Sequence, residues 1–112
     1  SLYQDIPSFQ VLVMTEKEIL AEKIRALLTR NYARDLYDIY FLINKNTELS
    51  KDMIEKKLSY YNKRLNKNEL KEKIREKKDI WETELSPLVK DLPKFKDVLE
   101  KVEKILLNQV KS

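Results

Sequence analysis

The chain has 112 residues, of which 42% are hydrophobic and 38% are charged, and its formal net charge is +4. This size suits one domain with one core, and the mixture is typical of a folded globular protein rather than a disordered one. Glycine, cysteine and histidine are absent, which excludes glycine-rich phosphate loops, disulfides, zinc sites with the usual ligands, catalytic thiols and Ser-His-Asp triads.

The first predicted element is a short strand near the N-terminus, where Ser8 to Met14 form a β-branched and aromatic run after Pro7. A lone strand needs partners for its backbone hydrogen bonds, so we expect residues 1–14 to belong to a sheet completed by upstream sequence. The predicted fold class is mainly α. One helical domain spans residues 1–112, with a helical bundle over residues 15–112, and we expect it to be the C-terminal fragment of a larger α/β protein.

A helix follows, because Thr15 and Glu18 have the spacing of a capping box. It is predicted to begin at Glu16 and to end near Arg30 or Asn31. Its apolar stripe has three- and four-residue spacing and consists of Ile19, Leu20, Ile24, Leu27 and Leu28. Lys23 falls inside this stripe, so its side chain is predicted to point inward or along the edge of a cleft.

The next predicted helix, Arg34 to Leu42, is apolar on nearly every side and is therefore expected to be buried. The short connection before it predicts an antiparallel helix pair that brings Lys23 near Asp35 or Asp38. A purely structural alternative stays open. In it Arg34 forms an ion pair with Asp38 four residues later, and Asp35 favours the start of the helix.

The remaining helices are predicted from caps and prolines. Ser50 caps one helix, and another begins at Asn68 and includes Trp81. Ser86-Pro87 and Pro93 each mark a further helix start. The last helix is long and amphipathic, and its stripe either closes the core or offers a surface to a second copy or to another protein.

The stretch from Lys56 to Lys78 is strongly basic, with ten Lys or Arg and three Glu. Together with Tyr60, Tyr61 and Trp81 it predicts contacts to RNA phosphates and stacking on unpaired bases. The candidate nucleic-acid-binding residues are Lys56, Lys57, Lys63, Arg64 and Lys67. The alternative is a solvated helix face with Glu-Lys pairs such as Glu69 with Lys73, and with the aromatic residues in the core.

Two motifs, Glu18 to Leu27 and Arg34 to Leu42, resemble the C-terminal motifs of the AbiEii/AbiGii toxin family, which is nucleotidyltransferase-like and belongs to type IV toxin-antitoxin systems. The resemblance implies phage defence, a nucleoside triphosphate substrate, Mg²⁺ and a cognate antitoxin. The family's glycine-containing turn and its serine-aspartate motif are missing here. We therefore expect this chain to be inactive alone, and Mg²⁺ to be held mainly by residues outside it.

By the same resemblance, Lys23 steadies nucleotide phosphates, and the family's arginine and aspartates fall on Arg34, Asp35 and Asp38. One aspartate would act as a base or polar anchor near an acceptor hydroxyl, which we expect at the end of an RNA. The spacing does not choose between them, and we favour Asp38 because buried surroundings would raise its pKa toward the range of a base. The alternative function is a non-enzymatic basic helical module that binds nucleic acid or a protein. No signal peptide or membrane-spanning run is evident, so a cytoplasmic protein without membrane contact is predicted.

Overall fold

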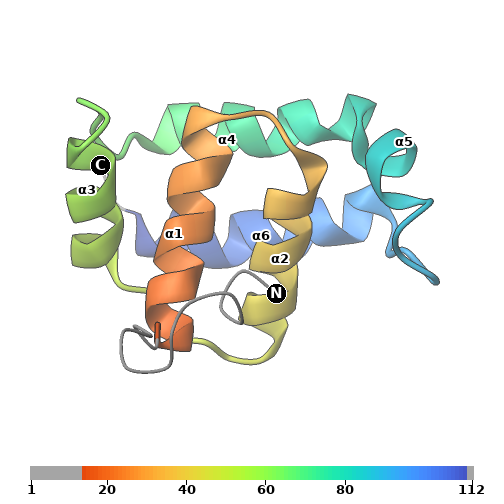
Figure 1. The fold of residues 1–112 in the computed structure, drawn as a ribbon, viewed down its shortest axis with the longest axis horizontal. Coiled ribbons are helices and arrows are strands. Elements are labelled where there is room, and N and C mark those ends of the chain that lie inside the picture. Colours follow the sequence, from red (N-terminus) through yellow and green to blue (C-terminus); the bar gives the residue numbers. More distant parts are fainter. Residues whose placement is uncertain (1–13, 111–112) are drawn as a thin grey trace, which may run out of the picture.

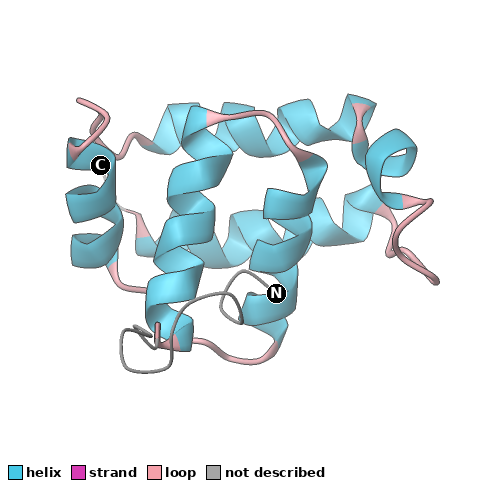
Figure 2. Cartoon of the chain, viewed as in Figure 1, coloured by secondary structure: helices cyan, strands magenta, loops and turns pink. Residues whose placement is uncertain are grey.

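Six α-helices make up the part of the chain that the computed structural model describes, residues 14–110 (Figures 1 and 2). They are α1 (Glu16–Thr29), α2 (Ala33–Asn44), α3 (Lys51–Ser59), α4 (Lys67–Glu76), α5 (Trp81–Leu85) and α6 (Phe95–Gln109), with a 3-10 turn, η3 (Lys77–Asp79), between α4 and α5. The prediction of a mainly α protein is confirmed. No strand occurs within the described residues, and the predicted strand over residues 8–14 falls almost wholly outside them.

Local capping determines where three of the helices begin. The Thr15 hydroxyl accepts a hydrogen bond of 3.1 Å from the Glu18 N–H, as the capping box predicts. Ser50 caps α3 in the same way, through the N–H of Met53. Helix α4 begins at Lys67, slightly earlier than predicted, because Asn66 rather than Asn68 is its cap.

Two predicted helix starts are wrong or displaced. Ser86 and Pro87 end α5 instead of beginning a helix, since Ser86 is the C-cap and Pro87 has no N–H to extend the hydrogen-bond ladder. Trp81 does not lie on α4, because η3 interrupts the chain and Trp81 begins α5. Helix α6 begins at Phe95, two residues after Pro93.

Helices α1 and α2 lie antiparallel and side by side, with α3 on the other flank of α1 and α6 packed behind them (Figure 1). Their shared core includes Leu27, Leu36 and Leu58, all fully buried. Trp81 closes one end of this core. Its indole N–H donates a hydrogen bond of 2.9 Å to the carbonyl of Pro93, and the Phe95 ring packs edge-on at 5.8 Å.

The last helix closes the core, as the first of its two interpretations predicts. Val98, Val102 and Leu106 of α6 are all fully buried. The prediction that α2 is buried on all sides is wrong, because Phe41 is 54% exposed and lies beneath the ammonium group of Lys45. Helix α2 therefore has a solvent-facing side.

None of the helices between residues 14 and 110 has the length and hydropathy needed to cross a membrane.

Candidate functional site

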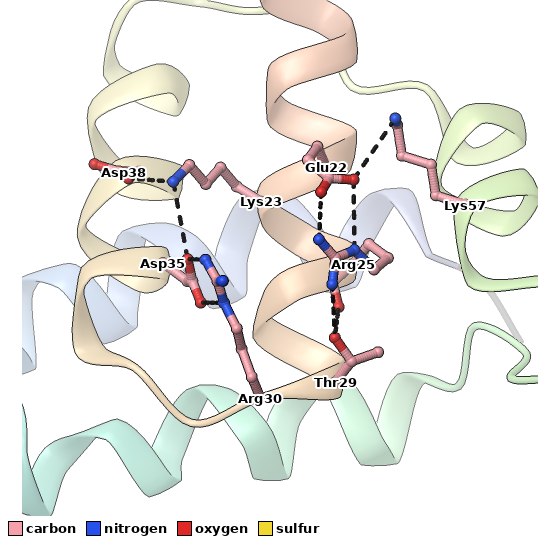
Figure 3. A network of polar contacts seen from close by, with 8 residues as sticks. All are labelled: Glu22, Lys23, Arg25, Thr29, Arg30, Asp35, Asp38 and Lys57. Atoms are coloured by element: carbon pink, nitrogen blue, oxygen red, sulfur yellow. Dashed lines mark hydrogen bonds and ion pairs between the residues drawn. The ribbon is translucent and has the colours of Figure 1, made fainter. Parts of the chain in front are cut away.

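The two charged motifs meet along the seam between α1 and α2 (Figure 3). Lys23 lies on α1, and Arg30 is the C-cap residue that follows α1, where the backbone is extended. Asp35 and Asp38 are three residues apart and share one face of α2. Because the helices run antiparallel, two cations from one helix face two carboxylates from the other.

The Arg30 guanidinium forms a bidentate pair with the Asp35 carboxylate. Nε and Nη2 donate to the two carboxylate oxygens of Asp35, each at 2.8 Å. The Asp35 side chain is fully buried, whereas that of Arg30 is 39% exposed. The hydrogen bonds to Asp35 raise the pKa of Arg30 above its ordinary value. This bidentate geometry is the strongest kind of carboxylate pair, so Asp35 is fixed in place.

Lys23 lies between the two carboxylates. Its ammonium Nζ is 2.8 Å from Oδ2 of Asp38 and 3.9 Å from Oδ1 of Asp35. The prediction that Lys23 approaches these aspartates is confirmed, and its side chain is 27% exposed. Among the described residues, Lys23 is the one cation paired with Asp38, so any movement of Lys23 would release that carboxylate.

Three details differ from the sequence-based predictions. Arg34 is exposed and does not pair with Asp38. Its guanidinium lies 5.7 Å from the centre of the Tyr32 ring. Asp35 is the buried aspartate, whereas the side chain of Asp38 is 39% exposed. Arg30 was not predicted as a site residue, because it lies in the extended C-cap position after α1, where helical periodicity does not place its side chain.

Helix α5 supports this seam from the end where Asp35 lies. The cap residue of α2, Tyr32, makes no side-chain cap hydrogen bond. Instead, a carboxylate oxygen of Glu84 accepts the N–H of Ala33 at 2.8 Å. The Glu84 carboxylate, distant in sequence, thus satisfies a backbone N–H that would otherwise lack a partner at the start of α2. Its negative charge also interacts favourably with the positive end of the α2 dipole.

A fully buried lysine, Lys77, lies at the start of η3. Its ammonium donates to the backbone carbonyl of Lys73 at 3.1 Å. Burial lowers the pKa of Lys77, and the carboxylates of Glu76, Asp35 and Glu84 partly oppose this effect. A buried ammonium with this limited pairing is costly.

Replacing Lys77 by methionine is therefore expected to raise the free energy of unfolding by about 1 to 2 kcal/mol at pH 7. The native pKa of Lys77 lies below its ordinary 10.5, so between these two values the unfolded chain binds more protons and the wild type becomes more stable as pH rises. The gain from Lys77→Met should shrink accordingly. Urea unfolding of the wild type and the variant at pH 7 and pH 10 measures this difference in the free energy of unfolding. A variant less stable than the wild type at pH 7 would contradict the prediction and show that nearby carboxylates compensate the charge of Lys77.

The donor set along the seam does not suit a resident divalent cation. Both aspartates are already engaged by Lys23 and Arg30, and no cluster of three acidic side chains with metal-binding geometry occurs among the described residues. The arrangement is better suited to anions and protons. A partly exposed ammonium can meet a phosphate, and a partly exposed carboxylate can accept a proton.

The basic stretch from Lys56 to Lys78 divides into paired and unpaired cations. The paired ones are Lys57 with Glu22, Lys63 with Glu69, Lys73 with Glu76, and Arg75 with Glu103. The expected ion pair between Glu69 and Lys73 is therefore wrong, because Glu69 pairs with Lys63 and Lys73 pairs with Glu76. Lys56, Arg64 and Lys67 are exposed and form no ion pair with any described residue. Tyr60 and Tyr61 are exposed, whereas Trp81 belongs to the core and is closed to a base.

Comparison with known proteins identifies a family. Searches of curated proteins and of solved structures return no match to the chain. A family model described as nucleotidyl transferase AbiEii toxin, type IV TA system, matches residues 1–103, which includes both charged motifs and all but the end of α6. The match extends well beyond the two motifs that suggested the resemblance. The chain therefore belongs to the nucleotidyl transferase AbiEii toxin family of type IV toxin-antitoxin systems.

Proposed function

We propose that the seam between α1 and α2 is the part of a nucleotidyltransferase site that contacts the phosphates and the acceptor. The observation that supports this proposal is the position of the Lys23 ammonium between Asp35 and Asp38, with a partly exposed side chain. Membership of the AbiEii family gives the reaction class. The substrates are a nucleoside triphosphate and a hydroxyl acceptor, which we take to be at the end of an RNA.

The three charged side chains have different roles in this proposal. Asp35 stays clamped by Arg30 and keeps the local charge fixed. Lys23 exchanges its contact with Asp38 for the triphosphate, because phosphate carries more negative charge than one carboxylate. Asp38, thus released, accepts the proton of the acceptor hydroxyl. The acceptor oxygen bonds to the α-phosphorus, the bond from that phosphorus to the bridging oxygen breaks, and pyrophosphate leaves.

The proposal assigns Mg²⁺ no ligand among the described residues, and no step above depends on one. The glycine and serine-aspartate motifs expected of the family are absent from the 112 residues. We propose that the chain supplies one half of the site. Activity is therefore to be measured on the full-length protein.

The function is tested by incubating the full-length protein with labelled nucleoside triphosphates, Mg²⁺ and total RNA. We expect labelled RNA and one pyrophosphate for each nucleotide transferred. Asp38→Asn should lower the transfer rate by about 10²- to 10⁴-fold, because it removes the proton acceptor and keeps the shape. Asp97→Asn, an exposed aspartate in the first turn of α6, is the matched control.

Two outcomes would contradict the proposal. One is an unchanged transfer rate in the Asp38→Asn variant, which would show that Asp38 is not the base. The other is hydrolysis of triphosphate by the wild type without any labelled RNA, which would show that the acceptor is water rather than RNA. A non-enzymatic module would give neither labelled RNA nor pyrophosphate.

A further inference from the structure

The connection between α3 and α4 presents a surface that the reaction above does not use. Helix α3 ends at Ser59, and the N–H groups of Asn62 and Lys63 bond back to carbonyls of the last helical turn. Asn62 has a φ of 56°, the left-handed conformation that is common after helix ends. Asn66 then caps α4. The backbone of the turn is therefore held by hydrogen bonds at both ends.

Two tyrosines project from this turn. Tyr60 is 77% exposed and Tyr61 is 51% exposed. Both are large side chains that the described part of the chain leaves open to solvent. The guanidinium of Arg25 on α1 lies 5.0 Å from the centre of the Tyr61 ring. That contact holds Tyr61 against α1, whereas the Tyr60 ring is open to solvent. An exposed aromatic ring offers a face on which an unpaired base can stack.

Positive charge surrounds the tyrosines. Lys56, Arg64 and Lys67 are exposed and have no ion-pair partner among the described residues. Lys57 forms a longer ion pair, with Nζ 3.6 Å from Glu22, on the flank of α1 opposite the Lys23 seam (Figure 3). Burial alone would raise the pKa of Glu22, but Arg25 and Lys57 hold it below its ordinary value.

Two surface depressions flank the turn. One, of about 410 Å³, is bordered by Lys56, Lys57 and Tyr60, and also by Glu18 and Met53. The other, of about 590 Å³, is bordered by three cations, two carboxylates and three amide side chains: Lys63, Arg64, Lys73, Glu69, Glu72, Asn62, Asn66 and Asn68. Amides can both donate and accept hydrogen bonds, as base edges and ribose hydroxyls require. An aromatic ring between cationic and amide-lined hollows matches the chemistry of an unpaired nucleotide.

We propose that the α3–α4 turn binds a single-stranded segment of RNA, with a base stacked on Tyr60 and phosphates held by Lys56, Arg64 and Lys67. The choice of RNA rests on the proposed function, whose acceptor is an RNA end. Because the same α1 carries Lys23 on its other flank, RNA docked on this turn lies beside the helix that holds the nucleotide.

The test uses a fluorescent twelve-nucleotide oligouridine and fluorescence anisotropy with the full-length protein, without nucleoside triphosphate. Tyr60→Ala should weaken binding by about tenfold, a loss of one stacked base. Lys56→Ala/Arg64→Ala/Lys67→Ala should weaken it further and reduce the slope of log K against log salt by about 2. Controls are Phe41→Ala, another exposed aromatic residue, and Lys90→Ala/Lys96→Ala/Lys104→Ala, three exposed lysines elsewhere.

Equal losses in the control and test variants would overturn the proposal, because binding would then reflect overall charge or hydrophobicity. Equal or tighter binding of oligodeoxyuridine would overturn the choice of RNA. Equal competition by polyglutamate, lost in Tyr60→Ala, would indicate a protein partner instead. The result is separable from the proposed function, since Lys23→Ala should bind the oligonucleotide as the wild type does even if no nucleotide is transferred.

Discussion

Replacing Lys23 by alanine is expected to lower nucleotide transfer by about 10²- to 10³-fold in the full-length protein. The reason is that a preorganised cation facing a developing phosphate charge accounts for about 3 to 4 kcal/mol of transition-state stabilisation. Stability should change little, because the Lys23 side chain is 27% exposed and Asp35 keeps both hydrogen bonds from Arg30. Transfer kinetics and a thermal melt measure the two effects separately.

Lys17→Ala is the matched control for this variant. Lys17 lies on the same helix, and its ammonium is 3.0 Å from Glu48, so the substitution also removes one ion pair from α1. We expect full transfer activity in this control. A comparable loss of activity in both variants would mean that the stability of α1, rather than the position of Lys23, controls the reaction.

Replacing Asp35 by alanine is expected to destabilise the fold by about 3 kcal/mol and to lower the Tm by roughly 15 °C. The substitution removes a fully buried carboxylate and leaves Arg30 without its bidentate partner. It also leaves a small cavity beside the start of α2. Urea unfolding and thermal melts measure this loss.

Asp38→Ala is the control for the second variant, and it should cost about 1 kcal/mol or less. Asp38 is 39% exposed, and its ion-pair partner among the described residues is a partly exposed lysine. The two aspartates therefore differ in what they do: Asp35 supports the structure of the seam and Asp38 is available for chemistry. Equal destabilisation by the two substitutions would remove this distinction.

Much of the helical architecture could be predicted because its signals are local. Thr15 and Ser50 cap helices at the expected positions, since a side chain that bonds an N–H three residues later depends on nothing else in the fold. The spacing of Val98, Val102 and Leu106 likewise predicted the buried side of α6. The antiparallel pairing of the first two helices was predicted from the short connection between them.

The end of α4 and the segment around Trp81 could not be predicted in this way. The Ser86-Pro87 pair has the composition of a helix start, but the chain there is fixed by a distant contact, the hydrogen bond from Trp81 to Pro93. Such a bond between residues twelve apart leaves no periodic pattern in the sequence. Tertiary contacts thus override a short-range signal.

The candidate site shows the same division. The spacing of Asp35 and Asp38 places them on one helix face, but it does not say which of them is covered. That depends on α5, whose Glu84 bonds to the first residue of α2 and covers the end where Asp35 lies. The role of Arg30 depends on the extended conformation at the end of α1, which directs its side chain back toward α2.

The most direct test of the account is whether Lys23 holds a triphosphate. Thermal melts of the full-length wild type, Lys17→Ala and Lys23→Ala are recorded with and without a nucleoside triphosphate at about 100 times its wild-type Kd. Binding at that concentration stabilises a protein by about 2.7 kcal/mol, a rise in Tm of roughly 10 °C. We predict this rise for the wild type and Lys17→Ala and little or none for Lys23→Ala. An equal rise in all three proteins would contradict the account.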